Sequence, residues 1–174
     1  MSGTYSLNLP GEMLTRGFWL YVWRVTTPKG ERLYVGRTGD NSSPYATAPY
    51  TRMGQHLGFV KAANSLRRLL LKEEIEPERC ANYELISHGP LFPEVGLRQG
   101  QDRSVQMELH KPVRDKMAGL EKKLRDELDA TGYKVLNVVH SRQPFDEQLW
   151  QQVRASFASH FPRLIATEHE VRGR

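Results

Sequence analysis

The chain has 174 residues and very little cysteine, since Cys80 is the only one. An internal disulfide is therefore excluded, and a reducing compartment is expected. No apolar run approaches the roughly 20 residues that a membrane-spanning helix needs. The first 16 residues also lack the basic and then apolar order of a signal peptide. Together these features predict a cytoplasmic protein with no membrane partner.

Two common kinds of motif are missing as well. The histidines other than His56 show no zinc-ligand spacing with Cys80, which argues against a structural zinc site. No glycine-rich loop followed by Lys-Ser or Lys-Thr is present, which argues against nucleotide hydrolysis. The sequence also contains no internal repeat.

The composition is that of one globular domain with a basic surface. Hydrophobic residues make up 39% of the chain and charged residues 26%, which is typical of a folded protein with a real core. The net charge is +5, and the isoelectric point is about 9.4. Such a surface attracts polyanions, of which nucleic acid is the commonest, although many basic proteins bind none.

An aromatic β-hairpin is predicted near the N-terminus. Residues 18–25 are rich in aromatic and β-branched side chains, residues 26–31 contain proline and glycine, and residues 32–37 form the return strand. With an even number of residues in the loop, Tyr21 and Tyr34 project from the same face of the hairpin. An odd number would separate them.

Arg52 and His56 are expected on one face of a short helix. The helix covers residues 52–57 and can end at Gly58, and the two side chains are at positions i and i+4. Four further elements are predicted nearby: a loop at 38–51, a helix at 62–75 with Leu66, Leu69 and Leu70 inward, a strand at 83–87 and a loop at 89–103.

A long helix is predicted from Pro112, in its first turn, to about residue 130. Glu121 borders its apolar stripe, and Glu127 occupies the mirror border, so periodicity does not separate the two as a candidate metal ligand. Either glutamate could also simply reach solvent. The stripe consists of Val113, Met117, Leu120, Leu124 and Leu128. Beyond it we expect an extended segment at 133–139 and a last helix capped by Asp146, with Leu149, Val153 and Phe157 inward.

Several polar side chains along the chain suit phosphodiester hydrolysis. That reaction needs an activated water, stabilisation of charge on phosphate oxygens and help for the leaving group, and a divalent ion on a carboxylate can supply the last two. Taken singly, each candidate has a commoner structural explanation, such as a core tyrosine or a solvated helix arginine. The candidates are Tyr21, Tyr34, Arg52, His56, Glu121 and Asn137. Arg37, Arg67 and Arg68 are candidate nucleic-acid contacts.

The order of these residues resembles the GIY-YIG nuclease superfamily. Trp19-Leu20-Tyr21, a turn and then Tyr34-Val35-Gly36 are similar to its paired signature, and Arg52-x-x-x-His56 follows where that family has its helical arginine. Glu121 and Asn137 resemble the family's metal-binding glutamate and terminal asparagine, and that spacing favours Glu121 over Glu127.

The resemblance implies a fold, a cofactor and a role for each residue. The fold is α+β, with a small central three-stranded antiparallel sheet flanked by helices and the site across one sheet face. One Mg²⁺ or Mn²⁺ would bind Glu121. The implied roles are general base for Tyr21, positioning of water or phosphate for Tyr34, charge stabilisation for Arg52, proton transfer or support of Tyr21 for His56, and architectural support for Asn137.

The sequence departs from the family in its first motif, which reads Trp-Leu-Tyr, and in long insertions at 38–51 and 58–111. The predicted organisation is an N-terminal extension (1–16), a nuclease core (17–140), a C-terminal helical extension (141–164) and a flexible tail (165–174). The predicted function is a metal-dependent endonuclease that hydrolyses phosphodiester bonds in DNA. A non-catalytic nucleic-acid-binding module of the same fold is the first alternative. A protein-interaction domain that uses residues 18–25 is the second.

Overall fold

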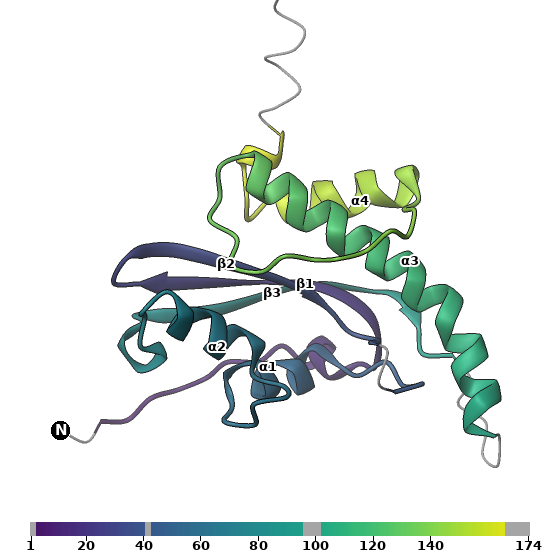
Figure 1. Cartoon of the computed structure of the whole chain (residues 1–174), viewed down its shortest axis with the longest axis horizontal. Helices are drawn as coiled ribbons and strands as arrows, with labels where there is room; N and C mark the ends of the chain where they lie inside the picture. The colour runs from purple at the N-terminus through teal and green to yellow at the C-terminus, as the bar shows by residue number, and fades with distance from the viewer. Residues whose placement is uncertain (1–2, 41–42, 96–101, 166–174) are drawn as a thin grey trace, which may run out of the picture.

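A three-stranded antiparallel sheet lies between two layers of helices in the computed structural model (Figure 1). The structure describes residues 3–40, 43–95 and 102–165. The strands are β1 (Gly17–Thr27), β2 (Gly30–Arg37) and β3 (Asn82–Pro93), in the order β2-β1-β3. The helices are α1 (Pro49–Leu57), α2 (Ser65–Lys72), α3 (Arg103–Ala130) and α4 (Glu147–Ala158), with short 3₁₀ turns at Gly11–Leu14 and Pro77–Arg79. The predicted α+β class is confirmed.

The β1–β2 hairpin has the register that brings the two site tyrosines to one face. Thr27 pairs with Gly30, so the loop is the two residues Pro28 and Lys29, an even number. Strand β1 then places Tyr21 opposite Gly36 and Trp23 opposite Tyr34. Because alternate residues of a strand share a face, Tyr21 and Tyr34 project from the same side of the sheet, as predicted.

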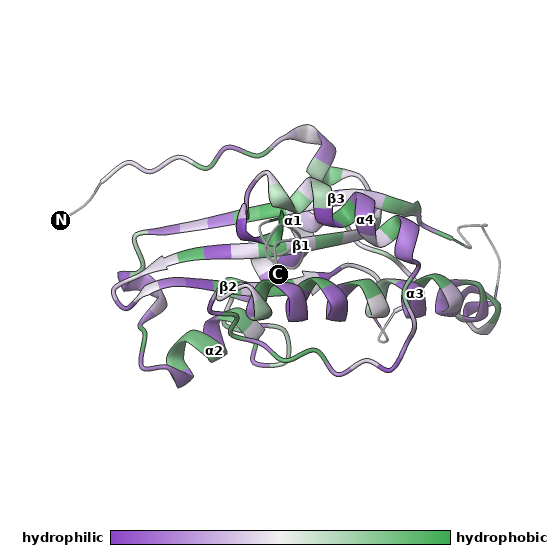
Figure 2. Ribbon diagram, turned by 90° about the horizontal axis from the view of Figure 1, so that it is seen from above, coloured by the Kyte–Doolittle hydropathy of each residue, from purple (hydrophilic) through white to green (hydrophobic). Residues whose placement is uncertain are grey.

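Strand β1 is central, and both of its faces are buried. Phe18, Leu20 and Val22 point to the face covered by α3 and α4, where Leu120 and Val153 belong to the same apolar cluster. Tyr21, Trp23 and Val25 point to the opposite face, where they pack with Leu66 and Leu70 of α2. Figure 2 shows that hydrophobic and hydrophilic residues also alternate along α3. Side chains on the two faces of β1 thus belong to two separate hydrophobic cores.

Helix α3 begins nine residues earlier than the sequence analysis predicts. Asp102 caps it, because its side chain accepts a hydrogen bond from the backbone N–H of Ser104. Pro112 therefore lies inside the helix, and its expected place in the first turn is wrong. A proline there removes one intrahelical hydrogen bond. The helix nevertheless continues through Pro112, since it begins after the cap at Asp102.

Strand β3 is also longer than predicted, and it replaces the first part of the loop expected at 89–103. It pairs with β1 from Asn82 opposite Thr26 to Pro93 opposite Gly17, with a shift of register between Phe18 and Leu20. The shift lets pairing continue through the glycine and proline that had indicated a loop. Residues 96–101 of the predicted loop lie outside the described residues.

The predictions for the last helix and for the extended segment before it agree with the structure. Asp146 caps α4 by accepting from the N–H of Leu149, and Val153 and Phe157 are buried as expected. The segment at 133–139 is extended and lies along the open edge of β2, where Leu33 bonds both Lys134 and Leu136 through its backbone at 2.8 Å. Of the predicted tail, residues 166–174 lie outside the described part of the chain. In that part, no helix is long and apolar enough to cross a membrane.

Candidate functional site

The centre of the candidate site is a buried contact between a strand tyrosine and a helix histidine. Tyr21 Oη lies 2.6 Å from His56 Nε2. The Tyr34 ring lies beside the same imidazole, with ring centroids 4.8 Å apart. The hairpin register supplies the two tyrosines, and α1 supplies His56 one turn after Arg52. Three of the predicted residues thus meet on the α1–α2 side of the sheet.

Gly36 has a steric role beside Tyr21. It is the cross-strand partner of Tyr21, and a Cβ atom at Gly36 would lie 2.5 Å from that ring. Real Cβ contacts are essentially never that short. The phenol can therefore lie across β2 only because position 36 has no side chain. This explains why glycine follows the tyrosine and valine in this strand.

Arg52 sits beside this pair, held by two polar neighbours. It forms an ion pair with Asp40, and its Nη1 donates to Gln55 Oε1 at 3.0 Å. Two polar atoms here are buried without a hydrogen-bond partner among the described residues, namely Arg52 Nε and His56 Nδ1. Buried polar atoms are rarely left unpaired in folded proteins. The site therefore has unused hydrogen-bonding capacity at its guanidinium and imidazole.

The helix border that faces the site belongs to Glu121. Its Oε2 accepts a hydrogen bond from Arg37 Nε at 2.9 Å, and both side chains are largely buried, at 15% and 13% exposed. Glu127 instead accepts from Lys123 at 2.6 Å within the same helix. Because Arg37 ends strand β2, the pair ties α3 to the hairpin. The geometry thus separates two glutamates that helical periodicity left equal.

The candidate site is assembled from both layers of the molecule. Glu121 belongs to α3, on the opposite face of the sheet from Tyr21 and Tyr34. Even so, its charge raises the pKa of both phenols. The resemblance implied a site across one sheet face, whereas the structure builds it from the two faces. Arg37, the last residue of β2, holds the Glu121 carboxylate at the end of that strand.

Burial dominates the acid–base properties of the site. It raises the pKa of Tyr21 well above its usual value, with Tyr34 adding to the effect and Arg52 opposing it. It likewise raises the pKa of Tyr34 to about 12. Burial and then the Arg52 charge lower the pKa of His56 to about 4. At neutral pH both phenols are therefore protonated and the imidazole is neutral.

The pKa of Glu121 is raised as well, because burial outweighs the opposing charges of Arg37 and Arg52. Burial lowers the pKa of Arg52, but Tyr21 and Asp40 raise it above its ordinary value. The guanidinium thus stays charged at neutral pH. A buried cation beside a neutral imidazole and two phenols suits an anionic ligand.

Asn137 is engaged with the backbone of the strand that carries Tyr34. Its Oδ1 accepts from the N–H of Val35 at 3.0 Å, and its Nδ2 donates to the carbonyl of Val35 at 2.8 Å. The carboxamide thus extends the backbone pairing at the edge of β2. This geometry is compatible with the architectural role that the resemblance implies for Asn137.

The three arginines expected to contact nucleic acid lie in different settings. Arg37 is occupied by Glu121 and by the carbonyl of Gly39. Arg67 is 16% exposed and pairs with Glu78, while Arg68 is exposed on α2. The charge of Arg68 acts on the Tyr34 phenol, which places it near the site. Only Arg68 of the three is open to solvent.

Three contacts of the site were not found by sequence reasoning. Arg37 was expected at a nucleic-acid surface rather than as the partner of Glu121, and neither Asp40 nor Gln55 was singled out. Arg37 comes directly after Tyr34-Val35-Gly36, and Gln55 lies three residues after Arg52, so their positions in sequence carried some signal. Asp40 carried none, because its loop has no repeating pattern.

A divalent ion fits Glu121 as a single protein ligand. In the described residues no cluster of three or more histidine, cysteine, aspartate or glutamate side chains could hold a metal. Glu121 is, however, a largely buried carboxylate, and burial raises its pKa despite the opposing charges of Arg37 and Arg52. Mg²⁺ is often held by one or two carboxylates, with water and substrate phosphate as its other ligands. The donor set is compatible with that arrangement.

Comparisons of the chain with protein-family models, with curated proteins and with solved structures gave no match.

Proposed function

We propose that the protein is a metal-dependent endonuclease that hydrolyses phosphodiester bonds in DNA. The observation that carries the proposal is the 2.6 Å contact of Tyr21 with His56, next to a buried guanidinium and a buried carboxylate. The unpartnered Arg52 Nε and His56 Nδ1 support it further, because phosphate oxygens are acceptors for such groups. The residues have the chemistry of the GIY-YIG-type site that the sequence resembles.

In the proposed mechanism Tyr21 and His56 act as a proton relay. With the imidazole hydrogen on Nδ1, the Tyr21 hydroxyl donates to His56 Nε2. Because its pKa is raised, the Tyr21 phenol keeps its proton at neutral pH. It therefore accepts a proton from water only while it passes its own proton to His56. The lowered pKa of His56 keeps the imidazole unprotonated at neutral pH, so Nε2 can accept, and it makes the imidazole a weak base that readily gives the relayed proton up again.

Arg52 and Tyr34 would act on the phosphate. Arg52 exchanges Asp40 for a non-bridging oxygen, and its planar fork can donate twice to a phosphate. Tyr34, protonated because of its raised pKa, donates to the attacking water or to the phosphate. Water adds to phosphorus as it gives its proton to Tyr21, and the P–O bond opposite it breaks. The leaving oxygen takes a proton from solvent and His56 returns one to solvent, so the products are a phosphomonoester and an alcohol. A divalent ion on Glu121 would supply charge stabilisation and help the leaving oxygen.

The proposed compartment is the cytoplasm, in agreement with the single cysteine.

One observation favours the second candidate, a non-catalytic nucleic-acid-binding module. Both Arg52 and Glu121 are held in ion pairs, with Asp40 and Arg37 respectively, and structural ion pairs need no catalysis to explain them. Against it, pure binding does not require a buried tyrosine–histidine contact beside a carboxylate.

The test is cleavage of labelled single-stranded, duplex and branched DNA by the purified protein, with Mg²⁺ or with EDTA. We expect cutting of at least one substrate with Mg²⁺ and none with EDTA. Tyr21→Phe should lower the single-turnover rate by about a hundredfold or more, because it removes the relay hydroxyl. Tyr83→Phe is the matched control, since its hydroxyl donates to the carbonyl of Pro77 away from the site. No cleavage of any substrate, or a fully active Tyr21→Phe, would overturn the proposal.

A further inference from the structure

The segment that contains α1 and α2 is entirely free of acidic residues. Between Asp40 and Glu73 the sequence has no aspartate or glutamate. The same stretch forms α1, α2 and the loop between them, next to the candidate site. Its basic residues are Arg52, Lys61, Arg67, Arg68 and Lys72. A segment with basic residues and no acidic ones is complementary to a polyanion.

One aromatic side chain stands out from this basic segment. Phe59, in the loop between α1 and α2, is 80% exposed, more than any other phenylalanine of the described residues. One face of its ring is covered by Arg67, whose guanidinium carbon lies 4.4 Å from the ring centroid. Glu78 accepts from Arg67 Nη2 at 2.5 Å and holds that arginine in place. Arg67 thus covers one face of the Phe59 ring, and the other face is open to solvent.

Phe59 lies close to the proposed catalytic residues. It is three residues beyond His56, and consecutive Cα atoms are 3.8 Å apart, so the two Cα atoms are within about 11 Å of each other. Arg68, whose charge acts on Tyr34, belongs to the helix that begins after the same loop. A nucleic acid held at Arg52 would therefore pass near Phe59.

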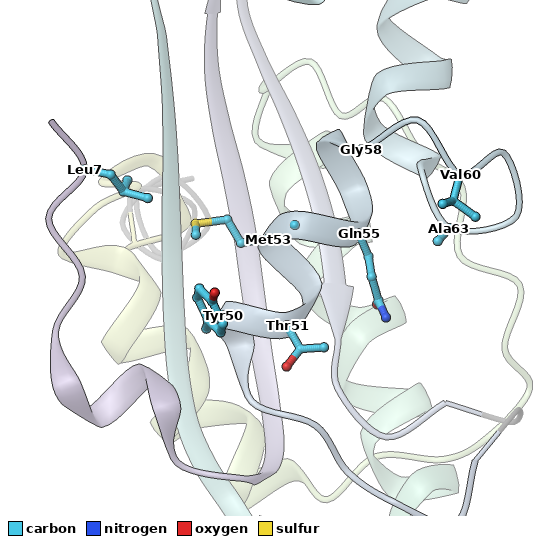
Figure 3. Close-up of a pocket in the computed structure, with 9 residues that line it drawn as sticks. Leu7, Tyr50, Thr51, Met53, Gln55, Gly58, Val60 and Ala63 are labelled. Carbon is cyan, nitrogen blue, oxygen red and sulfur yellow. The ribbon is translucent and has the colours of Figure 1, made fainter. Parts of the chain in front are cut away.

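The loop also forms one wall of an open apolar pocket. Gly58 and Val60, on either side of Phe59 in sequence, line it together with Tyr50 and Met53 of α1, as Figure 3 shows. The pocket measures about 710 Å³, within the usual range for small-molecule sites. Gln55, also in its lining, is the residue that accepts from Arg52. Space for a displaced base therefore exists between the loop and the helix that carries Arg52.

We propose that Phe59 is a stacking platform for an unpaired nucleobase next to the cleaved bond. The inference rests on the proposed nuclease function and adds a substrate class, namely single-stranded or branched nucleic acid. Stacking on an aromatic ring is available only to a base that has left its helix. Lys61 and Arg68 then meet the phosphates on either side. An exposed ring on a basic surface matches this occupant better than a protein partner, which would need a larger uncharged area.

The test measures binding in EDTA, where no cleavage occurs. Fluorescence anisotropy gives the Kd for a paired duplex and for the same duplex with a single-stranded flap, for the wild type, Phe59→Ala and Phe59→Trp. We expect Phe59→Ala to weaken flap binding by about tenfold and duplex binding by less than about twofold. Phe59→Trp should keep wild-type affinity, because it retains a stacking face. Leu71→Ala, which trims an exposed apolar residue of α2, is the matched control.

A Phe59→Ala protein with unchanged affinity, or with equal losses on both substrates, would overturn the stacking role. Cleavage with Mg²⁺ is measured separately, so the two proposals can fail independently. If the wild type binds the flap through Phe59 but never cuts DNA, the nuclease proposal is refuted and the stacking role of Phe59 stands. Wild type that cuts, with Phe59→Ala equal to it in binding and rate, refutes the platform alone. Failure of the wild type to bind any nucleic acid refutes both, and would make a protein the better partner for this surface.

Discussion

Tyr21 and His56 form a buried pair, with 2.6 Å between the phenol oxygen and Nε2 of the imidazole. The pair joins the central strand to α1, and His56 is only 5% exposed. A contact of this kind affects stability as well as chemistry, because an imidazole that stays neutral when folded can still take up a proton when unfolded.

The first prediction concerns pH and stability. Burial lowers the pKa of folded His56 to about 4, whereas an unfolded histidine titrates near 6.5. As the pH falls below about 6.5, the unfolded state binds a proton that the folded state does not. Stability therefore decreases between about pH 6.5 and pH 4, by up to about 3 kcal/mol from this group, and no further below that.

Urea unfolding at pH 7, 6, 5 and 4 measures the effect. His56→Gln should show a flatter dependence on pH than the wild type, whatever its absolute stability. His140→Gln is the control, because that histidine is exposed and its removal should leave the profile unchanged. Parallel profiles for the wild type and His56→Gln would show that His56 is not the titrating group.

The second prediction concerns the glycine beneath Tyr21. Gly36→Ala should lower the free energy of unfolding by about 1–3 kcal/mol, because the new Cβ would lie 2.5 Å from a buried ring. The displaced phenol should also lose its contact with His56, so cleavage should fall. Gly54→Ala in α1 is the matched control, as its Cβ would meet nothing within 4 Å. That variant should be up to about 1 kcal/mol more stable, and a similar loss in both would contradict the steric role.

Local rules predicted the parts of the fold that depend on neighbouring residues. The common face of Tyr21 and Tyr34 was predicted on condition that the hairpin loop has an even number of residues, and the two-residue loop of the structure meets that condition. The cap at Asp146 and the inward face of α4 follow from the sequence. The start of α3 was missed because Pro112 resembles a helix start, whereas the cap at Asp102 lies well before it.

The parts that depend on tertiary contacts could not be predicted. Helical periodicity treats Glu121 and Glu127 alike, and only the approach of Arg37 from another element separates them. The pairing of Arg52 with Asp40 likewise requires a loop to fold back onto α1. Family spacing favoured Glu121, but the ion pair and the two-layer construction of the site are visible only in the folded chain.

The third prediction concerns Asp40. If Arg52 must leave Asp40 to bind phosphate, Asp40→Asn should tighten DNA binding in EDTA by about two- to fivefold, a modest gain because the ion pair is partly exposed. Asp126→Asn is a control matched in charge, since Asp126 pairs with Lys122 on α3. An equal gain in both variants would mean that net charge alone is responsible, and a loss in Asp40→Asn would contradict the exchange.

The most direct test of the nuclease proposal compares two glutamates of one helix. Single-turnover cleavage with Mg²⁺ is measured for Glu121→Ala and Glu127→Ala, with circular dichroism to confirm that both are folded. Because Glu121 is proposed to hold the ion and Glu127 only pairs with Lys123, Glu121→Ala should cut at least about a hundredfold more slowly and Glu127→Ala at the wild-type rate. Full activity in folded Glu121→Ala, or its loss in Glu127→Ala instead, would contradict the proposed site.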